Sequence, residues 1–178
     1  KSGFFLITDF RKAFSFGSVT LMTVPMPDTY TQIHLQCVFA VKYRLALIHP
    51  LWEELLYKYI AGIVRNQGHK LLAINGMPDH IHLFLGLRPV QAVSDLMREI
   101  KGDSSLWINK QGLAGGRFKW QEGFGAFSYK KSDVPMICGY IAKQKEHHRV
   151  KNFMQEYQEL LNEFDVSFKK EYLFHEPK

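Results

Sequence analysis

Apolar and polar residues alternate along two stretches of the chain in the way that half-buried strands require. In HIHLFLGL, residues 80–87, Ile81 and the leucines take one face, so His80 and His82 point together to the other. In TQIHLQCVFAV, residues 31–41, one face carries Ile33, Leu35, Cys37, Phe39 and Val41. Both stretches are therefore predicted to be strands with an apolar face turned to the core.

Apolar residues at helical spacing predict helices between and after these strands. The first helix begins at Pro50 and ends at Gly68, and a short strand over residues 70–75 then leads through the turn Gly76-Met77-Pro78 to the histidine strand. Pro89 opens the second helix, whose inward residues are Val90, Val93, Leu96, Met97 and Ile100. This order predicts an α+β fold, the ferredoxin-like (RRM-like) sandwich, in which helices cover one face of an antiparallel sheet and leave the other available for ligands.

The second half of the chain supplies a strand region and two more helices. Aromatic residues alternate with small or polar ones over residues 118–128, where Trp120 and Phe127 are interpreted as core, with stacking on nucleic-acid bases as the alternative. Ser132 is predicted to cap a helix that continues through residues 134–150. A last amphipathic helix is predicted from about residue 152 to 164.

Composition limits the classes of protein to consider. The 178 residues, 46% of them hydrophobic, suit one domain, predicted over residues 29–178 after an atypical N-terminal extension of residues 1–28. Lys and Arg outnumber Asp and Glu by 23 to 17, a mild bias towards polyanionic partners. Two cysteines are too few for a disulfide framework, and no apolar run reaches the ~18 residues of a membrane span. We expect a soluble cytoplasmic protein with no membrane partner.

The candidate chemistry combines the histidine strand with the helix after Ser132. Imidazoles two residues apart on a strand are about 7 Å apart along it and can converge on one ion. Tyr140 and Gln144 are four residues apart, so they share one face of a helix. A glutamine carbonyl can join His80 and His82 in binding Mg²⁺ or Mn²⁺, which would polarise a phosphodiester for attack by the tyrosine hydroxyl.

Further histidines follow the tyrosine. His147 and His148 are interpreted as solvated residues at a helix end, where the helix dipole favours them, with a direct catalytic role as the alternative.

Three segments, in this order, resemble the single-tyrosine HUH transposases of the insertion-sequence 200/605 family (IS200-like). They are Asp79-His80-Ile81-His82, the run WQEGFG over residues 120–125, and the run GYIAKQ over residues 139–144. The resemblance extends from about Tyr30 to Tyr172, and only the leader lies outside it.

This resemblance implies a specific enzyme of DNA transposition and recombination. It implies an HUH nuclease fold in which His80, His82 and Gln144 hold Mg²⁺ or Mn²⁺, and in which Tyr140 attacks single-stranded DNA to give a 5′-phosphotyrosine and a free 3′-hydroxyl. It also implies recognition of hairpins at the ends of the mobile element. Such enzymes act as homodimers in which the tyrosine helix of one chain completes the histidine site of the other in trans.

Three alternatives remain open at this point. A non-catalytic RRM-like module would bind single-stranded RNA on its open sheet face, but the paired histidines stand where that module needs aromatic rings. A domesticated relative would bind or nick repeat hairpins without moving an element, or would act in replication or plasmid transfer. A structural Zn²⁺ site is a poor match, because two histidines and a glutamine lack the thiolates typical of such sites.

Overall fold

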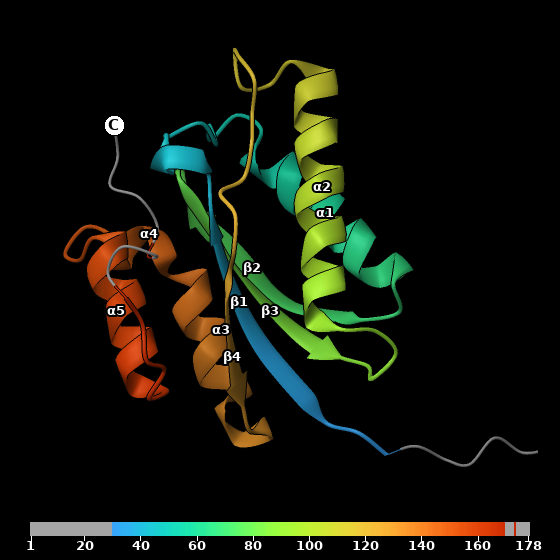
Figure 1. Ribbon diagram of the computed structural model, residues 1–178, viewed down its shortest axis with the longest axis vertical. Coiled ribbons are helices and arrows are strands. Elements are labelled where there is room, and N and C mark those ends of the chain that lie inside the picture. The colour runs from blue at the N-terminus through green and yellow to red at the C-terminus, as the bar shows by residue number, and fades with distance from the viewer. Residues whose placement is uncertain (1–29, 170–172, 174–178) are drawn as a thin grey trace, which may run out of the picture. The chain divides into compact units, whose positions relative to one another are not determined.

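The fold centres on a four-stranded antiparallel sheet with the strand order β2-β3-β1-β4, in a computed structural model that describes residues 30–169 and 173 (Figure 1). The predicted N-terminal extension, residues 1–28, lies outside the described residues, so its boundary stays a prediction. The strands are β1 (Ile33–Ala40), β2 (Lys70–Met77), β3 (His80–Leu87) and β4 (Gly125–Tyr129).

Helices alternate with these strands in the predicted order, which confirms the α+β ferredoxin-like arrangement. Short 3-10 turns at Lys42–Arg44 and Lys131–Asp133 precede α1 and α3. The helices are α1 (Glu53–Asn66), α2 (Val93–Gln111), α3 (Val134–Ala142), α4 (Gln144–His147) and α5 (Phe153–Glu163).

The main core lies between the sheet and the pair α1 and α2. The odd-numbered residues of β1 and β3, which the alternation assigns to one face, all point into it. Trp120 also lies there and donates its indole N–H to Ser104 at 2.9 Å, so its interpretation as a core residue is confirmed. The fully buried members of this core include Cys37, Phe39, Leu56, Ile60, Ile81, Leu83, Leu85 and Leu96.

The other face of the sheet is not left open, which corrects the expectation that helices cover one face only. The apolar stripe of α5 packs on Val38, Ala40 and Phe127, and α3 packs on Phe84 through Ile137 and Ile141. In Figure 1, α3 and α5 lie on the side of the strands opposite α1 and α2. The site therefore forms beneath helices and not on a bare sheet.

Two local predictions in the first half are wrong. The second helix begins at Val93 and not at Pro89, and Val90 is 60% exposed instead of facing the core. Strand β2 continues to Met77, which pairs with His80, so the hairpin turn contains only Pro78 and Asp79. A tighter turn brings Asp79 directly beside the first histidine.

Helix α3, which carries Tyr140, also differs from its prediction. Ser132 does not cap it, because its hydroxyl donates to Asp133 instead of accepting from the helix backbone. The helix ends at Ala142, since the N–H of Lys143 is shared between the carbonyls of Gly139 and Tyr140, and the short α4 then starts at Gln144. Within the described part of the chain, no helix is both long and apolar enough to cross a membrane.

Candidate active site

The two histidines of β3 occupy the sheet face that α3 and α5 cover. His80 and His82 are 1% and 0% exposed, and their ring centroids are 5.2 Å apart. They pair across the sheet with Ala40 and Val38 of β1, whose small side chains leave room for the rings. The alternation of β3 therefore delivers both imidazoles to one place, as predicted.

Asp79 fixes the orientation of His80. Its Oδ1 accepts a hydrogen bond from Nδ1 of His80 at 2.7 Å, while Arg44 donates to Oδ2 at 2.6 Å. Burial alone would raise the pKa of Asp79, but the contacts with His80 and Arg44 outweigh it and lower that pKa to about 2. Burial lowers the pKa of His80 to about 4. The ring is thus neutral, with the lone pair of Nε2 directed into the site.

Gln36 and Tyr129 hold the second histidine. The Gln36 amide contacts Nδ1 of His82 at 3.0 Å, and the Tyr129 hydroxyl donates to the amide oxygen at 3.0 Å. An imidazole that binds a metal through Nε2 carries its proton on Nδ1. Exchange of the amide oxygen and nitrogen, which have nearly the same shape, lets Gln36 accept that proton and donate to Tyr129.

Tyr140 and Gln144 reach the same site even though the helix breaks between them. Both side chains contact Oε1 of Glu156: the Tyr140 hydroxyl donates to it, and the Gln144 amide donates to it at 2.8 Å. The ring centroids of Tyr140 and His82 are 6.2 Å apart. Burial, and then the negative charge of Glu156, raise the pKa of the Tyr140 hydroxyl above its ordinary range. The tyrosine is therefore a neutral phenol in this arrangement.

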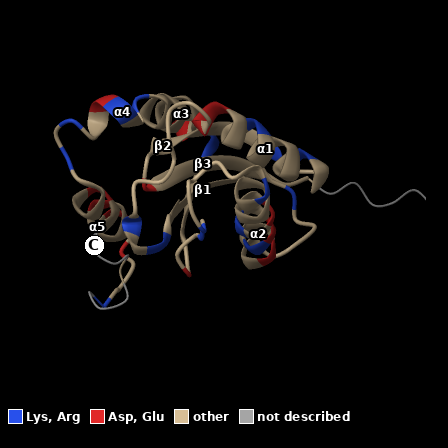
Figure 2. Cartoon of the chain, turned by 90° about the horizontal axis from the view of Figure 1, so that it is seen from above, with Lys and Arg blue, Asp and Glu red and all other residues tan. Residues whose placement is uncertain are grey.

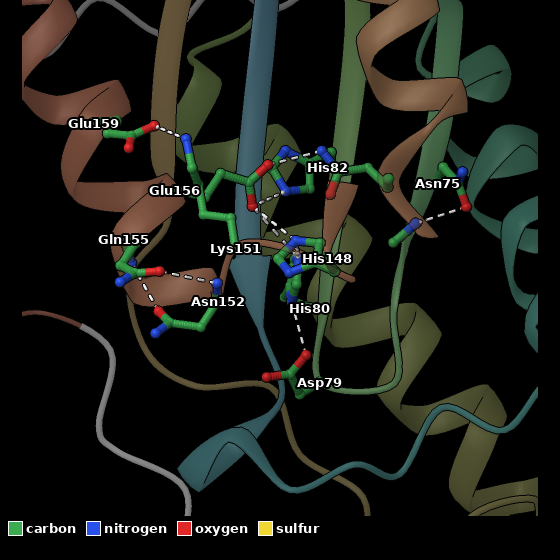
Figure 3. A network of polar contacts seen from close by, with 12 residues as sticks. Asn75, Asp79, His80, His82, His148, Lys151, Asn152, Gln155, Glu156 and Glu159 are labelled. Atoms are coloured by element: carbon green, nitrogen blue, oxygen red, sulfur yellow. Dashed lines mark hydrogen bonds and ion pairs between the residues drawn. The ribbon is translucent and has the colours of Figure 1, made fainter. Parts of the chain in front are cut away.

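Glu156 and His148 belong to the site although the sequence did not predict this. Glu156, in the first turn of α5, is 2% exposed, and its Oε2 lies 2.9 Å from Nε2 of His148 and 3.3 Å from Nε2 of His82. His148, predicted to be solvated at a helix end, has a side chain that is only 6% exposed, and its Nε2 lies 3.2 Å from Nε2 of His80. Figure 3 shows these side chains turned toward one another from β3, α5 and the turn after α4.

A weak sequence signal existed for each of the missed residues. Glu156 interrupts the apolar stripe of α5, three residues after Phe153 and four before Leu160, both of which are buried. A lone carboxylate on a buried stripe indicates a paired or ligating group. His148 carried only the signal of a neighbouring histidine, which does not distinguish a buried ring from a solvated one.

The donor set fits a divalent cation. One ligand atom from each of His80, His82, His148 and Glu156 can be chosen so that all four lie within 4.8 Å of one another. Among the described residues, Nε2 of His82 and Oε1 of Gln144 are buried without a hydrogen-bond partner. Such atoms are costly to bury unpaired, and imidazole nitrogens and amide oxygens are common ligands of divalent ions. The residues predicted to hold Mg²⁺ or Mn²⁺ are thus chemically suitable, although their role stays a prediction.

All these groups come from one chain. The structure brings together His80, His82, Tyr140 and Gln144 within a single chain. The predicted exchange of the tyrosine helix between two chains stays a prediction. A pocket of about 260 Å³ opens beside Tyr140, and its lining includes Gln36, Tyr129, Tyr140, His147 and Glu156. The tyrosine is therefore half-buried but reachable.

A family model described as "Transposase IS200 like" matches residues 29–144. This range begins just before β1, spans the histidine strand and ends at Gln144. The segment that carries His148 and Glu156 lies beyond it.

Individual proteins are also similar to this chain. The ISDra2 transposase TnpA of Deinococcus radiodurans is 26% identical over 121 residues, which cover 65% of this chain and 86% of that protein. A crystal structure assigned as a transposase of Deinococcus radiodurans R1 has a TM-score of 0.53 at 22% identity and covers 65% of this chain and 93% of that one. A REP-associated tyrosine transposase bound to a REP hairpin has a TM-score of 0.52 at 19% identity, with coverages of 69% and 73%. These structures share the fold.

Proposed function

Because the chain belongs to the IS200-like transposase family, we propose that it cleaves and rejoins single-stranded DNA at hairpin-marked ends of a mobile element. Tyr140 is the nucleophile in this proposal. The ligands of the divalent ion, Mg²⁺ or Mn²⁺, include His80, His82 and Gln144. One observation carries the proposal: a tyrosine hydroxyl and two buried imidazoles converge on a single carboxylate, that of Glu156.

The chemistry proceeds through a covalent link to the protein. Oη of Tyr140 attacks the phosphorus, the bond from phosphorus to the 3′ oxygen breaks, and a 5′-phosphotyrosine forms. The phenol loses its proton and the leaving 3′ oxygen gains one, which gives a free 3′-hydroxyl. When the 3′-hydroxyl of another strand attacks the phosphotyrosine, the strands are joined and the tyrosine is restored. The covalent link conserves the energy of the phosphodiester bond, so rejoining needs no ATP.

A neutral tyrosine beside carboxylates needs help to attack a phosphate. Glu159 and Glu163 line the pocket together with Glu156, so an approaching phosphodiester meets negative charge. A divalent ion held by the imidazoles would supply Lewis-acid polarisation of the phosphate and would offset this repulsion. Glu156 orients the tyrosine hydroxyl through the hydrogen bond it accepts.

Charge and comparison support a DNA hairpin as the partner. The net charge is +6, and the segment around α4, residues 143–151, carries Lys143, Lys145, Arg149 and Lys151 against one Glu; of these, Lys145 pairs with Glu53 and Lys151 with Glu159. Figure 2 shows basic residues on α4 and on the loop that leads to α5. Contacts of this kind with phosphates give salt-dependent affinity. The REP-associated relative is bound to a hairpin, which supports the same class of ligand here.

The test is formation of a covalent adduct. Full-length protein is incubated with single-stranded oligonucleotides from the flanks of its own gene, with Mg²⁺, Mn²⁺ or chelator, and analysed on denaturing gels. We expect a metal-dependent protein–DNA adduct that Tyr140→Phe abolishes. Tyr59→Phe is the matched control, because Tyr59 stacks on Trp107 in the α1–α2 layer.

Two outcomes would contradict the proposal in different ways. An adduct that persists in Tyr140→Phe but disappears in Tyr129→Phe would move the nucleophile to Tyr129, whose hydroxyl contacts Gln36 in the same site. Absence of any adduct together with tight binding of hairpins would indicate a non-catalytic or domesticated relative.

A further inference from the structure

Two potential ligands reach the site from the part of the chain beyond the family match. His148 lies in the turn after α4, and Glu156 lies in the first turn of α5, whereas the match ends at residue 144. Phe153, Tyr157 and Leu160 anchor α5 on β1 and β4 and thereby hold Glu156 over the histidines. The packing of α5 on the sheet therefore fixes the position of the buried Glu156 carboxylate.

We infer that His148 and Glu156 are ligands of the same ion as His80 and His82, which gives the site three imidazoles and one carboxylate from a single chain, in addition to the Gln144 amide oxygen. The inference rests on the proposed metal-dependent function and extends it, because it adds two ligands outside the matched region and assigns the class of metal.

The spacing of the donor atoms fits one coordination shell. Donors about 2.1 Å from an ion, at angles between 90° and the tetrahedral value, are roughly 3.0 to 3.4 Å apart. The separations are 3.2 Å between the Nε2 atoms of His80 and His148, and 2.9 Å and 3.3 Å from Oε2 of Glu156 to Nε2 of His148 and His82. The distance from Nε2 of His80 to the same oxygen is 3.9 Å, which corresponds to a wider angle. No two of the four ligand atoms are more than 4.8 Å apart. A single ion can therefore contact all four atoms after small movements.

A hydrogen-bond network alone satisfies these atoms poorly. His80 gives the proton of Nδ1 to Asp79, so its Nε2 offers a lone pair and no hydrogen. Nε2 of His148 faces both this lone pair and Oε2 of Glu156, yet one N–H cannot donate well to two acceptors at once. Nε2 of His82 makes no hydrogen bond. Several lone pairs thus converge on one point, which is the arrangement that a cation requires.

The buried negative charge of Glu156 also favours a bound cation. The basic side chains nearest to the Glu156 carboxylate are imidazoles, while Arg44 pairs with Asp79 and Lys145 pairs with Glu53. A carboxylate that is 2% exposed and faces imidazoles is stabilised when a cation lies between them.

This ligand set favours a transition metal over Mg²⁺. Imidazole nitrogen suits transition-metal ions such as Zn²⁺, and Mn²⁺ accepts both nitrogen and oxygen ligands, whereas Mg²⁺ prefers oxygen ligands and releases its waters reluctantly. A site with three imidazoles should therefore bind Mn²⁺ more tightly than Mg²⁺. Because α5 supplies one ligand, the ion also links the C-terminal helix to the histidine strand.

The test is direct metal binding by the full chain without DNA. Mn²⁺ is titrated into metal-free protein, and the free ion is followed by electron paramagnetic resonance. We expect His148→Asn and Glu156→Gln each to weaken Mn²⁺ binding by about tenfold or more, as His80→Asn does. The controls are His49→Asn, just before α1, and Glu54→Gln, in the first turn of α1; both side chains are exposed and lie outside the cluster, so both variants should bind Mn²⁺ as the wild type does.

The outcomes separate this inference from the function on which it rests. Wild-type affinity in His148→Asn and Glu156→Gln, with affinity lost in His80→Asn, would overturn the two added ligands and leave the original metal site standing. Wild-type affinity in His80→Asn and His82→Asn as well would remove the metal site itself.

A measurement on the wild-type protein tests the same inference without depending on whether a variant folds. Electron–nuclear double resonance on Mn²⁺-loaded protein with isotope-labelled histidine reports how many imidazoles bind the ion. Three coupled imidazoles support the inference, and two overturn it.

Discussion

The two faces of the central sheet are built from alternate residues of the same strands, yet one face is an apolar core and the other carries the candidate metal site. On the face toward α1 and α2, β3 contributes Ile81, Leu83 and Leu85 to an apolar core. On the face toward α3 and α5, the same strand contributes His80 and His82 to a buried polar cluster. The period of two along one strand thus places both histidines on one face, which also carries the apolar Phe84, and leaves the opposite face entirely apolar.

The difference has an energetic consequence. Burial of apolar side chains is favourable whatever the solution contains, at about 25 cal/mol per Å² removed from water. Burial of a carboxylate and three imidazoles is favourable only when their charges and lone pairs have partners. We therefore expect the apolar face to determine the free energy of unfolding, and the polar face to determine metal binding and activity.

The strongest test replaces a residue of the polar face. His82→Asn should reduce metal-dependent formation of the DNA adduct by roughly a hundredfold or more, because Lewis-acid activation is worth several kcal/mol. The free energy of unfolding without metal should change less than in a substitution of the apolar face. Gel quantification of the adduct and urea unfolding measure the two quantities.

The control is His34→Asn, a histidine of β1 whose ring contacts Phe84 and which is not part of the metal cluster. Its Mn²⁺ affinity should match that of the wild type. If His82→Asn formed the DNA adduct as well as the wild type does, the histidines of this face would not be needed for the reaction.

The converse test changes the next residue of the same strand. Leu83→Ala removes a fully buried side chain and should lower the free energy of unfolding by about 2 to 5 kcal/mol, while the protein that remains folded binds Mn²⁺ as before. Leu106→Ala, on the exposed side of α2 at 71% exposure, is the control and should cost little. A large loss of Mn²⁺ affinity in folded Leu83→Ala would mean that the two faces are coupled.

The same contrast explains what could be predicted from the sequence. Alternation along β1 and β3 was enough to assign the apolar core and the shared face of His80 and His82, because strand period is a local property. The helical spacing of Tyr140 and Gln144 suggested that both approach the histidines, and the resemblance to a family implied their roles. His148 and Glu156 follow a helix break at Lys143 and a turn before α5, so their meeting with β3 depends on how α5 packs. Packing of this kind is a tertiary effect that no local pattern reports.

A smaller effect is expected from the group that orients His80. Asp79→Asn keeps the shape but weakens the hydrogen bond to Nδ1 and the ion pair with Arg44. Partners that orient a metal ligand typically contribute 10- to 100-fold to affinity, and a retained amide acceptor places this variant near the lower end, at about tenfold for Mn²⁺. Titration with Mn²⁺ measures it. Asp95→Asn, in an exposed ion pair with Arg98, is the control, and an unchanged affinity in Asp79→Asn would show that β3 alone fixes the ring.

The smallest expected effect concerns the start of the helix that carries Glu156. Asn152 caps α5: its side chain accepts from the N–H of Gln155, and the Gln155 side chain accepts in return from the N–H of Asn152. Asn152→Ala should cost about 1 kcal/mol in the free energy of unfolding. Asn162→Ala, exposed in the last turn of α5, should not destabilise the protein. Because Phe153 and Tyr157 still anchor the helix on the sheet, Mn²⁺ affinity should change less in Asn152→Ala than in Asp79→Asn. The reverse order would mean that the cap, and not apolar packing, holds the carboxylate over the histidines.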